Sequence, residues 1–389
     1  MIFAVYFKSY TEGCFVQQLI KMKINSFKLE RYFAQHEFTA KYLLSSSDCD
    51  GYELNYVLDN ASQEELELWQ NIRLGYTESA GNALLREAIL QFYHLQSIEN
   101  VVVASPGELN FISMNVLLNP GDHVITISPC YQSLSEVVKS IGCHLSYWKP
   151  NPDNWEFNTR DLEVLFKDNT RLIIINFPHN PTGSYITKDQ LNEIVEIARR
   201  NNVYIFSDEM YYKLIYGDTR ELPPISDIYE KGISLWGTSK TFGMAGLRTG
   251  WLVSQDTRFI NEVVSFKDYL SICNSATSEV LSIIALNNID CFLNPNIQKI
   301  DKNIRLFQEF SNRNTLVDSF IPPKAGSVAF VKLQIEKSAL QFSNELIEKT
   351  GIMTVPSEMF DYPGKYIRVG FGRENLPDTL HKLQDYGKD

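Results

Sequence analysis

From about residue 100 onward, the chain alternates short apolar runs rich in β-branched residues with longer amphipathic stretches. The apolar runs predict strands at residues 100–105, 122–128, 171–176, 203–208 and 233–237. The stretches between them predict helices at residues 108–118, 133–142 and 187–202, the last beginning with the capping-box pair Thr187 and Gln190. Such alternation is typical of a mostly parallel sheet with right-handed crossovers and helices on both faces.

The pattern changes after about residue 296. A long polar helix is expected at residues 297–314, then a helix at 338–351, a strand at 366–372 and a terminal helix. These fewer, mixed elements predict a smaller α+β domain. The expected organisation is an N-terminal segment that joins the small domain (1–60), a large domain (61–295) and a small C-terminal domain (296–389). Residues 1–21 are expected to pack little core.

The composition is that of an ordinary globular protein. The chain has 389 residues, enough for two domains, of which 44% are hydrophobic and 21% charged. A net charge of −11 opposes a general nucleic-acid or anionic-membrane surface, because both need clustered cations. Small molecules are therefore the expected partners.

The cysteines and the N-terminus bear on compartment. The six cysteines are scattered, without a CxxC pair or a zinc-binding histidine spacing, which predicts free thiols in a reduced compartment and no metal site. The sequence has no run near the roughly 18 apolar residues of a membrane helix. The apolar N-terminus lacks a basic region and is soon interrupted by Lys8, which disfavours a signal peptide. A cytoplasmic enzyme without a membrane partner is expected.

Polar residues follow three of the predicted strands. Asn180 lies just past residues 171–176, Asp208 and Tyr211 lie at the end of the next strand, and Lys240 follows residues 233–237. In an open α/β sheet the ligand sits beyond the carboxyl ends of the strands. An amide, a carboxylate with a phenol, and an amine are therefore expected at one edge.

These residue types have a specific joint use. Lysine forms Schiff bases with carbonyl compounds, including pyridoxal phosphate, and an acidic partner such as Asp208 keeps the pyridine nitrogen protonated. Arg248, the Ser239 hydroxyl and the N–H groups that open a helix after Ser105 could hold a phosphate. Each residue alone also has a structural explanation, since Asp208 could cap a turn and Asn180 could satisfy nearby backbone.

Together, the segments resemble the class I/II aminotransferase family of fold-type I pyridoxal-phosphate enzymes, from about Tyr76 to the C-terminus. The segments that carry the resemblance are LGYTESAGNALLREAI, NPGDHVITISPCYQS, HNPTG, SDEMY, SKTFGMAGLRTGW and YIRVGFGR. The resemblance implies a large domain with a mostly parallel sheet of the seven-stranded type, covered by helices, and a smaller α+β domain.

The resemblance also implies roles around the cofactor ring. Lys240 would form the Schiff base and then remove the Cα proton of the substrate. Asp208 would pair with the pyridine nitrogen, and Asn180 with Tyr211 would bind the phenolic oxygen. Tyr131 would stack on the ring. A free lysine has a pKa of about 10.4, so the resemblance requires that burial and neighbouring cations lower the pKa of Lys240.

Further implied roles concern the phosphate and the substrate. The expected phosphate ligands are Ser105, Pro106, Gly107, Ser239 and Arg248. Arg368 would bind the substrate α-carboxylate, with Asn180 beside it. Tyr76 matches a residue that in this family reaches the cofactor phosphate of the neighbouring subunit, so a homodimer is implied.

Three positions depart from the family pattern. Gly237 stands where many relatives have a second phosphate-binding serine, so one phosphate contact is either missing or supplied by Thr238. Pro106 lacks an N–H in the phosphate loop. Ser46, Ser47 and Asp48 stand where a glycine-containing segment is common. A polar wall including Asp48 would favour a substrate with a polar or cationic side chain; a plain turn capped by Asp48 is the alternative.

The expected function is amino-group transfer from an L-amino acid to a 2-oxo acid. A C–S β-lyase, an α-decarboxylase and a cyclase or oxidase of a guanidino amino acid share every cofactor contact and stay open, and Arg373 after the Arg368 strand resembles the last two weakly. A non-catalytic aminotransferase-like domain of a transcription factor is disfavoured, because only about seventy residues, without a basic helix pair, precede Tyr76.

Overall fold

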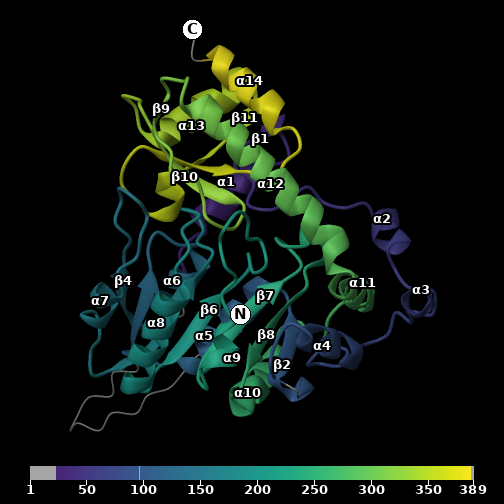
Figure 1. Cartoon of the computed structure of the whole chain (residues 1–389). Helices are drawn as coiled ribbons and strands as arrows, with labels where there is room; N and C mark the ends of the chain where they lie inside the picture. Colours follow the sequence, from purple (N-terminus) through teal and green to yellow (C-terminus); the bar gives the residue numbers. More distant parts are fainter. Residues whose placement is uncertain (1–22, 96, 387–389) are drawn as a thin grey trace.

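The computed structural model describes residues 23–95 and 97–386, so the expectation for residues 1–21 lies outside the described part (Figure 1). Its main element is a seven-stranded sheet of order β2-β8-β7-β6-β5-β3-β4, in which β8 alone runs antiparallel to its neighbours. The strands are β2 (Val101–Ala104), β3 (His123–Ile127), β4 (His144–Trp148), β5 (Thr170–Asn176), β6 (Tyr204–Asp208), β7 (Gly232–Gly237) and β8 (Gly250–Ser254). The expected fold class is confirmed.

Helices flank this sheet, and three of them lie where the hydrophobic pattern predicts helices. They are α5 (Pro106–Leu117), α6 (Ser133–Ile141), α7 (Thr159–Glu163), α8 (Lys188–Asn201), α9 (Ile225–Ile228), α10 (Thr257–Lys267) and α11 (Ala276–Asn287). The capping box of Thr187 and Gln190 is present at the start of α8, whose apolar side packs into the core of the sheet. The central strand β5 is buried on both faces except at Arg171, which accounts for its continuous apolar run.

A second layer, the smaller unit, lies beyond the carboxyl ends of the main strands (Figure 1). It holds an antiparallel sheet of order β12-β13-β10-β9. Its elements are β9 (Val317–Ser319), β10 (Val328–Leu333), α13 (Ala339–Thr350), β11 (Ile352–Met353), β12 (Val355–Pro356), η3 (Ser357–Phe360), β13 (Tyr366–Gly370) and α14 (Leu376–Tyr386). Strand β1 (Tyr42–Leu43) pairs in parallel with β11, which brings the N-terminal segment here. The exact domain limits stay a prediction.

Several elements have no counterpart in the sequence prediction. They include the helices α1 (Lys28–His36), α2 (Leu54–Asp59), α3 (Gln63–Gln70), α4 (Ala83–Leu90), η1 (Ile98–Asn100) and η2 (Ala245–Leu247), together with α7, α9, α10 and α11 and the strands β4 and β8. Apart from α10 and α11, these helices have nine residues or fewer, too few for a clear helical period. Strand β4 is half-exposed and has no β-branched residue. Short length and partial exposure therefore explain most of these omissions.

Helix α12 (Ile289–Ser311) begins earlier than the expected start at residue 297 and contains Pro295. A proline inside a helix removes the N–H that would bond to the carbonyl four residues before it, here Cys291. The Tyr56 hydroxyl donates to this carbonyl at 3.0 Å, and the Tyr52 hydroxyl donates to Phe292 O at 2.8 Å. Two tyrosines of the α2 segment thus supply hydrogen bonds to the helix carbonyls just before Pro295.

Among the helices of residues 23–95 and 97–386, none alone is long and apolar enough to cross a membrane. Taken together, helices α11 and α12 are long and apolar enough, but this is a statement about length and composition alone, and a bend of 75° separates the two helices.

Glu209 is a buried acid beside the main sheet. Its Oε1 accepts a hydrogen bond from the Ile225 N–H at 3.0 Å, at the start of α9. Burial raises its pKa from 4.5 to about 8, and the hydrogen bond from Ile225 opposes that rise. The folded chain therefore binds a proton at Glu209 that the unfolded chain releases at lower pH.

We predict that Glu209→Gln flattens the pH dependence of folding. A raised folded-state pKa gives stability that is fully present below pH 4.5 and is lost as pH rises through about 8. The wild-type free energy of unfolding should therefore fall, relative to Glu209→Gln, by on the order of 5 kcal/mol between acid and alkaline pH. Urea unfolding at several pH values measures this difference, and the exposed Glu348→Gln is the control. Parallel curves for the wild type and Glu209→Gln would contradict the assignment.

Candidate active site

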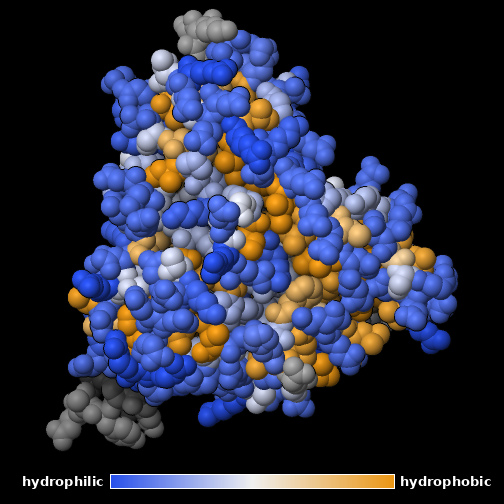
Figure 2. Space-filling model, in the orientation of Figure 1, coloured by the Kyte–Doolittle hydropathy of each residue, from blue (hydrophilic) through white to orange (hydrophobic). Residues whose placement is uncertain are grey.

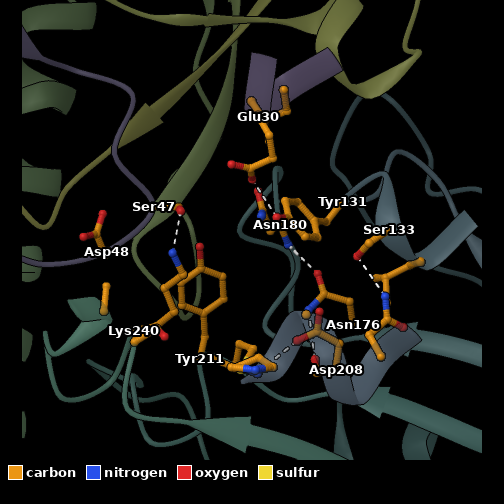
Figure 3. A pocket seen from close by; sticks show the side chains of 18 of the residues that line it. Glu30, Ser47, Asp48, Tyr131, Ser133, Asn176, Asn180, Asp208, Tyr211 and Lys240 are labelled. Carbon is orange, nitrogen blue, oxygen red and sulfur yellow. Dashed lines mark hydrogen bonds between the residues drawn. The ribbon is translucent and has the colours of Figure 1, made fainter. Parts of the chain in front are cut away.

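A cavity of about 480 Å³ opens at the carboxyl ends of β5, β6 and β7, between the main sheet and the smaller unit (Figure 3). Most predicted site residues line it, namely Asp48, Pro106, Gly107, Tyr131, Asn180, Asp208, Tyr211, Ser239, Lys240, Arg248 and Arg368. Ser105 and Tyr76 are absent from its lining. Eleven of the thirteen predicted residues therefore meet at this cavity, nine of them at the expected edge of the main sheet, while Asp48 and Arg368 reach it from outside that sheet.

Lys240 lies three residues after the end of β7, and its side chain enters the cavity. Its Nζ donates a hydrogen bond to Ser47 Oγ at 2.8 Å (Figure 3). Burial lowers the pKa of the Lys240 ammonium, the Asp48 charge raises it, and the Arg368 charge lowers it. The direction is the one that a lysine base requires, since a lower pKa leaves more free amine at neutral pH.

Asp208 is the last residue of β6 and is buried. Its Oδ1 accepts from the Met210 N–H at 3.2 Å. Burial raises its pKa from 3.8 to about 6, while the Met210 hydrogen bond and the Lys240 charge oppose the rise. Asp208 is thus ionised at neutral pH and available to a cationic partner in the cavity.

Asn176, at the end of β5, ties the two central strands together and was absent from the sequence prediction. Its Nδ2 donates to the Asp208 carbonyl at 2.9 Å, and its Oδ1 accepts from the Asn180 N–H at 2.9 Å. Parallel pairing places Asn176 beside Asp208 in the register. The signal was available, because Asn176 is the polar end of an otherwise apolar run.

Arg368 crosses from β13 of the smaller unit into the cavity and is 1% exposed. Its Nε and Nη2 donate to the Ser45 carbonyl at 3.2 and 2.9 Å, and its Nη1 donates to Asn180 Oδ1 at 3.2 Å. The Phe33 and Phe360 rings lie 5.7 and 5.5 Å from the guanidinium carbon. A buried guanidinium held this way is suited to bind a carboxylate with its planar fork.

The cavity residues fit the expected pyridoxal phosphate. The Ser239 hydroxyl is buried without a hydrogen-bond partner among the described residues, and the Tyr211 hydroxyl makes no bond of regular geometry there although Ser47 and Ser327 are near. A Cβ built on Gly107 would meet nothing, so the start of α5 faces open space. Unused buried hydroxyls and an open helix N-terminus are what a phosphorylated ring can satisfy.

The remaining predicted residues differ in placement. Arg248 lines the cavity with an exposed side chain and has a left-handed φ of 55°. Ser105 is the N-cap residue of α5, but its side chain makes no cap hydrogen bond. Tyr76 is 88% exposed, so within one chain it contacts no cofactor position. These roles stay predictions.

Asp48 lines the cavity, but its charge is compensated. Both of its carboxylate oxygens accept from Arg373 Nη2, at 3.1 and 3.2 Å. Two further carboxylates, Glu30 of the first helix and Glu37 at its C-cap, also line the cavity, and the sequence prediction omitted them. No motif marks either residue, because the helix lies more than 170 residues from Asp208 in the chain.

Gly237 is constrained by close packing. A Cβ at this position would lie 2.8 Å from Thr249 O and 2.9 Å from the Gly250 Cα, both on the neighbouring antiparallel segment. Thr238 does not replace a missing phosphate ligand, since its buried hydroxyl donates to the Thr249 carbonyl at 3.1 Å. The absent serine therefore reflects strand packing at the end of β7.

Known proteins resemble this chain over most of its length. Residues 39–381 match the protein family described as "Aminotransferase class I and II". The chain is 27% identical over 349 residues to capreomycidine synthase of Streptomyces vinaceus, with 88% of each chain covered. It is 28% identical over 334 residues to an aspartate aminotransferase of Pyrococcus horikoshii, with 79% of this chain and 82% of that one covered.

A solved structure is similar over nearly the whole chain. It is a PLP-dependent aminotransferase from Streptococcus suis, with a TM-score of 0.88 and 27% sequence identity. The match covers 94% of this chain and 98% of that chain.

We predict that Gly237→Ser destabilises the fold without improving cofactor binding. The added Cβ would overlap backbone on the β8 side, which should lower the free energy of unfolding by about 2 kcal/mol. Gly246→Ser is the matched control, because a Cβ there meets no atom within 4 Å. Chemical unfolding and a cofactor titration measure the two effects. A Gly237→Ser variant that is as stable as the control and binds the cofactor more tightly would refute the packing explanation.

Proposed function

The chain belongs to the aminotransferase class I and II family and is a pyridoxal-phosphate-dependent enzyme, and we propose that Lys240 is the residue through which it moves an amino group from an L-amino acid to a 2-oxo acid. The observation that carries this proposal is the convergence of Lys240, Asp208 and Arg368 on one cavity. An amine, a carboxylate and a guanidinium there match the three functions that the reaction needs.

When bound, pyridoxal phosphate supplies an aldehyde that bonds to amines and a ring that accepts electrons. Lys240 would hold this group through Nζ and, once released, take the proton from the substrate Cα. Its lowered pKa and its hydrogen bond to Ser47 support that role, since the amine is both less often protonated and held in position. The same Nζ would return the proton to the cofactor carbon.

Asp208 would hold the proton on the ring nitrogen. Burial costs its carboxylate solvation, so a cationic partner at this point is strongly favoured. The hydrogen bond from Met210 and the neighbouring Asn176 fix the orientation of this segment. On the opposite side of the ring position, Tyr131 would provide the stacking surface.

Arg368 would bind the substrate α-carboxylate together with Asn180. The Nη1 atom already points to Asn180 Oδ1, and the two residues come from different units of the chain. A carboxylate bound between them would orient the Cα–H bond toward Lys240. This arrangement supports selection of α-amino acids over simple amines.

A homodimer is the proposed assembly. Tyr76 and Leu74 are 88% and 87% exposed, and Tyr269 is 78% exposed, which is unusual for large apolar side chains. Figure 2 shows apolar residues gathered on one face beside α11 and α12. In a dimer, Tyr76 would serve the phosphate in the partner cavity.

We predict that purified holoenzyme converts amino acid and 2-oxo acid pairs by amino-group transfer, and that Lys240→Ala lowers turnover on the order of a thousandfold or more. The cofactor absorption spectrum and product chromatography measure both effects. The exposed Lys188→Ala is the control and should keep wild-type turnover. Full turnover by Lys240→Ala would overturn the assignment. Release of ammonia with pyruvate, or of carbon dioxide, would identify a β-lyase or a decarboxylase instead.

A second prediction concerns Tyr76. If Tyr76 serves the partner cavity, a hybrid of Tyr76→Ala and Lys240→Ala chains contains one cavity with both native residues. Each variant alone should be impaired, and the co-expressed, doubly tagged hybrid should recover about half of wild-type activity per dimer. No recovery in an isolated hybrid would show that Tyr76 acts within its own chain, and an unimpaired Tyr76→Ala variant would show that Tyr76 has no such role.

A further inference from the structure

The first helix, α1, forms one wall of the cavity with a mixed apolar and acidic face. Glu30, Phe33 and Glu37 are three and four residues apart, so they follow one another along one side of the helix, with Leu29 beside them. All four line the cavity. Phe33 also lies against Arg368, 5.7 Å from its guanidinium carbon, which places this wall next to the expected carboxylate site.

The charges of the cavity do not balance once the expected partners are assigned. Its lining carries four carboxylates and three cations. Asp208 would face the ring nitrogen, Arg248 the phosphate and Arg368 the substrate carboxylate, while Asp48 is paired with Arg373. Two carboxylates remain, Glu30 of α1 and Glu37 at the C-cap of that helix.

Neither carboxylate forms an ion pair within the described part of the chain, although the charges of Lys240 and Arg373 reach Glu37. Glu30 accepts a hydrogen bond from the neutral Tyr131 hydroxyl at 2.6 Å (Figure 3). Glu37 has no hydrogen bond or ion pair to its side chain within the described part of the chain. Burial raises the pKa of the Glu37 carboxyl, the charges of Asp48 and Glu30 raise it further, and the charges of Arg373 and Lys240 oppose that rise. A cation brought by a ligand would relieve this repulsion.

A separate observation in the same cavity also points to a ligand. The Ser46 side chain lines the cavity, is 2% exposed, and its hydroxyl has no hydrogen-bond partner among the described residues. A buried hydroxyl without a partner costs free energy that a polar ligand group would recover. The cavity therefore offers both charge and hydrogen bonding beyond what the cofactor and the α-carboxylate use.

We propose, resting on the proposed function, that the amino-acid substrate carries a cation at the end of an aliphatic side chain, and that Glu37 and Glu30 select it. The aliphatic part would pack on Phe33 and Leu29. Glu37 lies one helical turn beyond Phe33, about 6 Å along the axis, and would pair with the terminal ammonium or guanidinium. Glu30 adds a second negative charge on the same wall of the cavity.

The test compares charged side chains with neutral ones of similar shape, on the holoenzyme. L-arginine is compared with L-citrulline, and L-lysine with L-norleucine, by the concentration that half-saturates the change in cofactor absorbance. At least one charged member should bind about tenfold or more tightly than its neutral counterpart. The arginine pair reports a guanidinium and the lysine pair an ammonium. Ratios within twofold in both pairs would overturn the proposal.

Variants of Glu37 and Glu30 test whether these two residues cause the preference for charged side chains. Glu37→Gln should reduce the charged-to-neutral ratio about tenfold, and Glu30→Gln should reduce it by a smaller factor. Glu64→Gln, on the exposed side of α3, is the matched control. The unfolding midpoint and the cofactor spectrum check that each variant is folded and loaded. An unchanged ratio in folded Glu37→Gln and Glu30→Gln would refute their role.

Failure of this proposal differs from failure of the proposed function. If neutral amino acids donate their amino group and bind as tightly as charged ones, amino transfer stands and the cation site is wrong. If charged amino acids bind preferentially but no 2-oxo acid appears with any acceptor, the cation site stands and amino transfer is wrong.

Discussion

The cost of burying charge is the constraint on which the rest of the structure depends. Lys240, Asp208 and Arg368 lie in one cavity. Burial raises the pKa of Asp208 and lowers the pKa values of Lys240 and Arg368, so in each case it favours the neutral form. Each is held by a short-range polar partner, a serine hydroxyl, a backbone N–H and a backbone carbonyl respectively. The main sheet, the smaller unit and the N-terminal segment all contribute to this compensation.

The N-terminal segment around residues 44–48 joins the two units at the cavity. The Gly370 N–H donates to the Leu44 carbonyl at 2.7 Å, and the Ser327 hydroxyl donates to the Ser47 carbonyl at 2.7 Å. A Cβ at Gly370 would lie 1.7 Å from the Ser46 carbonyl oxygen, so the backbones meet where a side chain cannot fit. The segment that contacts Lys240 is therefore fixed by the same strand that carries Arg368.

Sequence patterns predicted the parts of the site that follow from strand order. Asp208 and Lys240 end or follow continuous apolar strands, and parallel pairing brings their ends to one edge. The wall formed by Glu30 and Glu37 could not be predicted this way, because its helix is short and reaches the cavity only through tertiary packing. The start of α12 was missed because Pro295 usually marks a helix end, whereas here tyrosine hydroxyls from elsewhere in the chain satisfy the carbonyls.

That repair around Pro295 has a mechanical consequence. Helix α12 runs from the large unit into the smaller one. At the turn before Pro295, its carbonyls accept hydrogen bonds from Tyr52 and Tyr56, which lie outside the helix. Any bending of α12 at this turn must break those two hydrogen bonds or move the α2 segment with the helix. The helix and the segment that carries the two tyrosines therefore move together. The stiffness of the link between the two units depends on Tyr52 and Tyr56, which lie more than 200 positions before α12 in the chain.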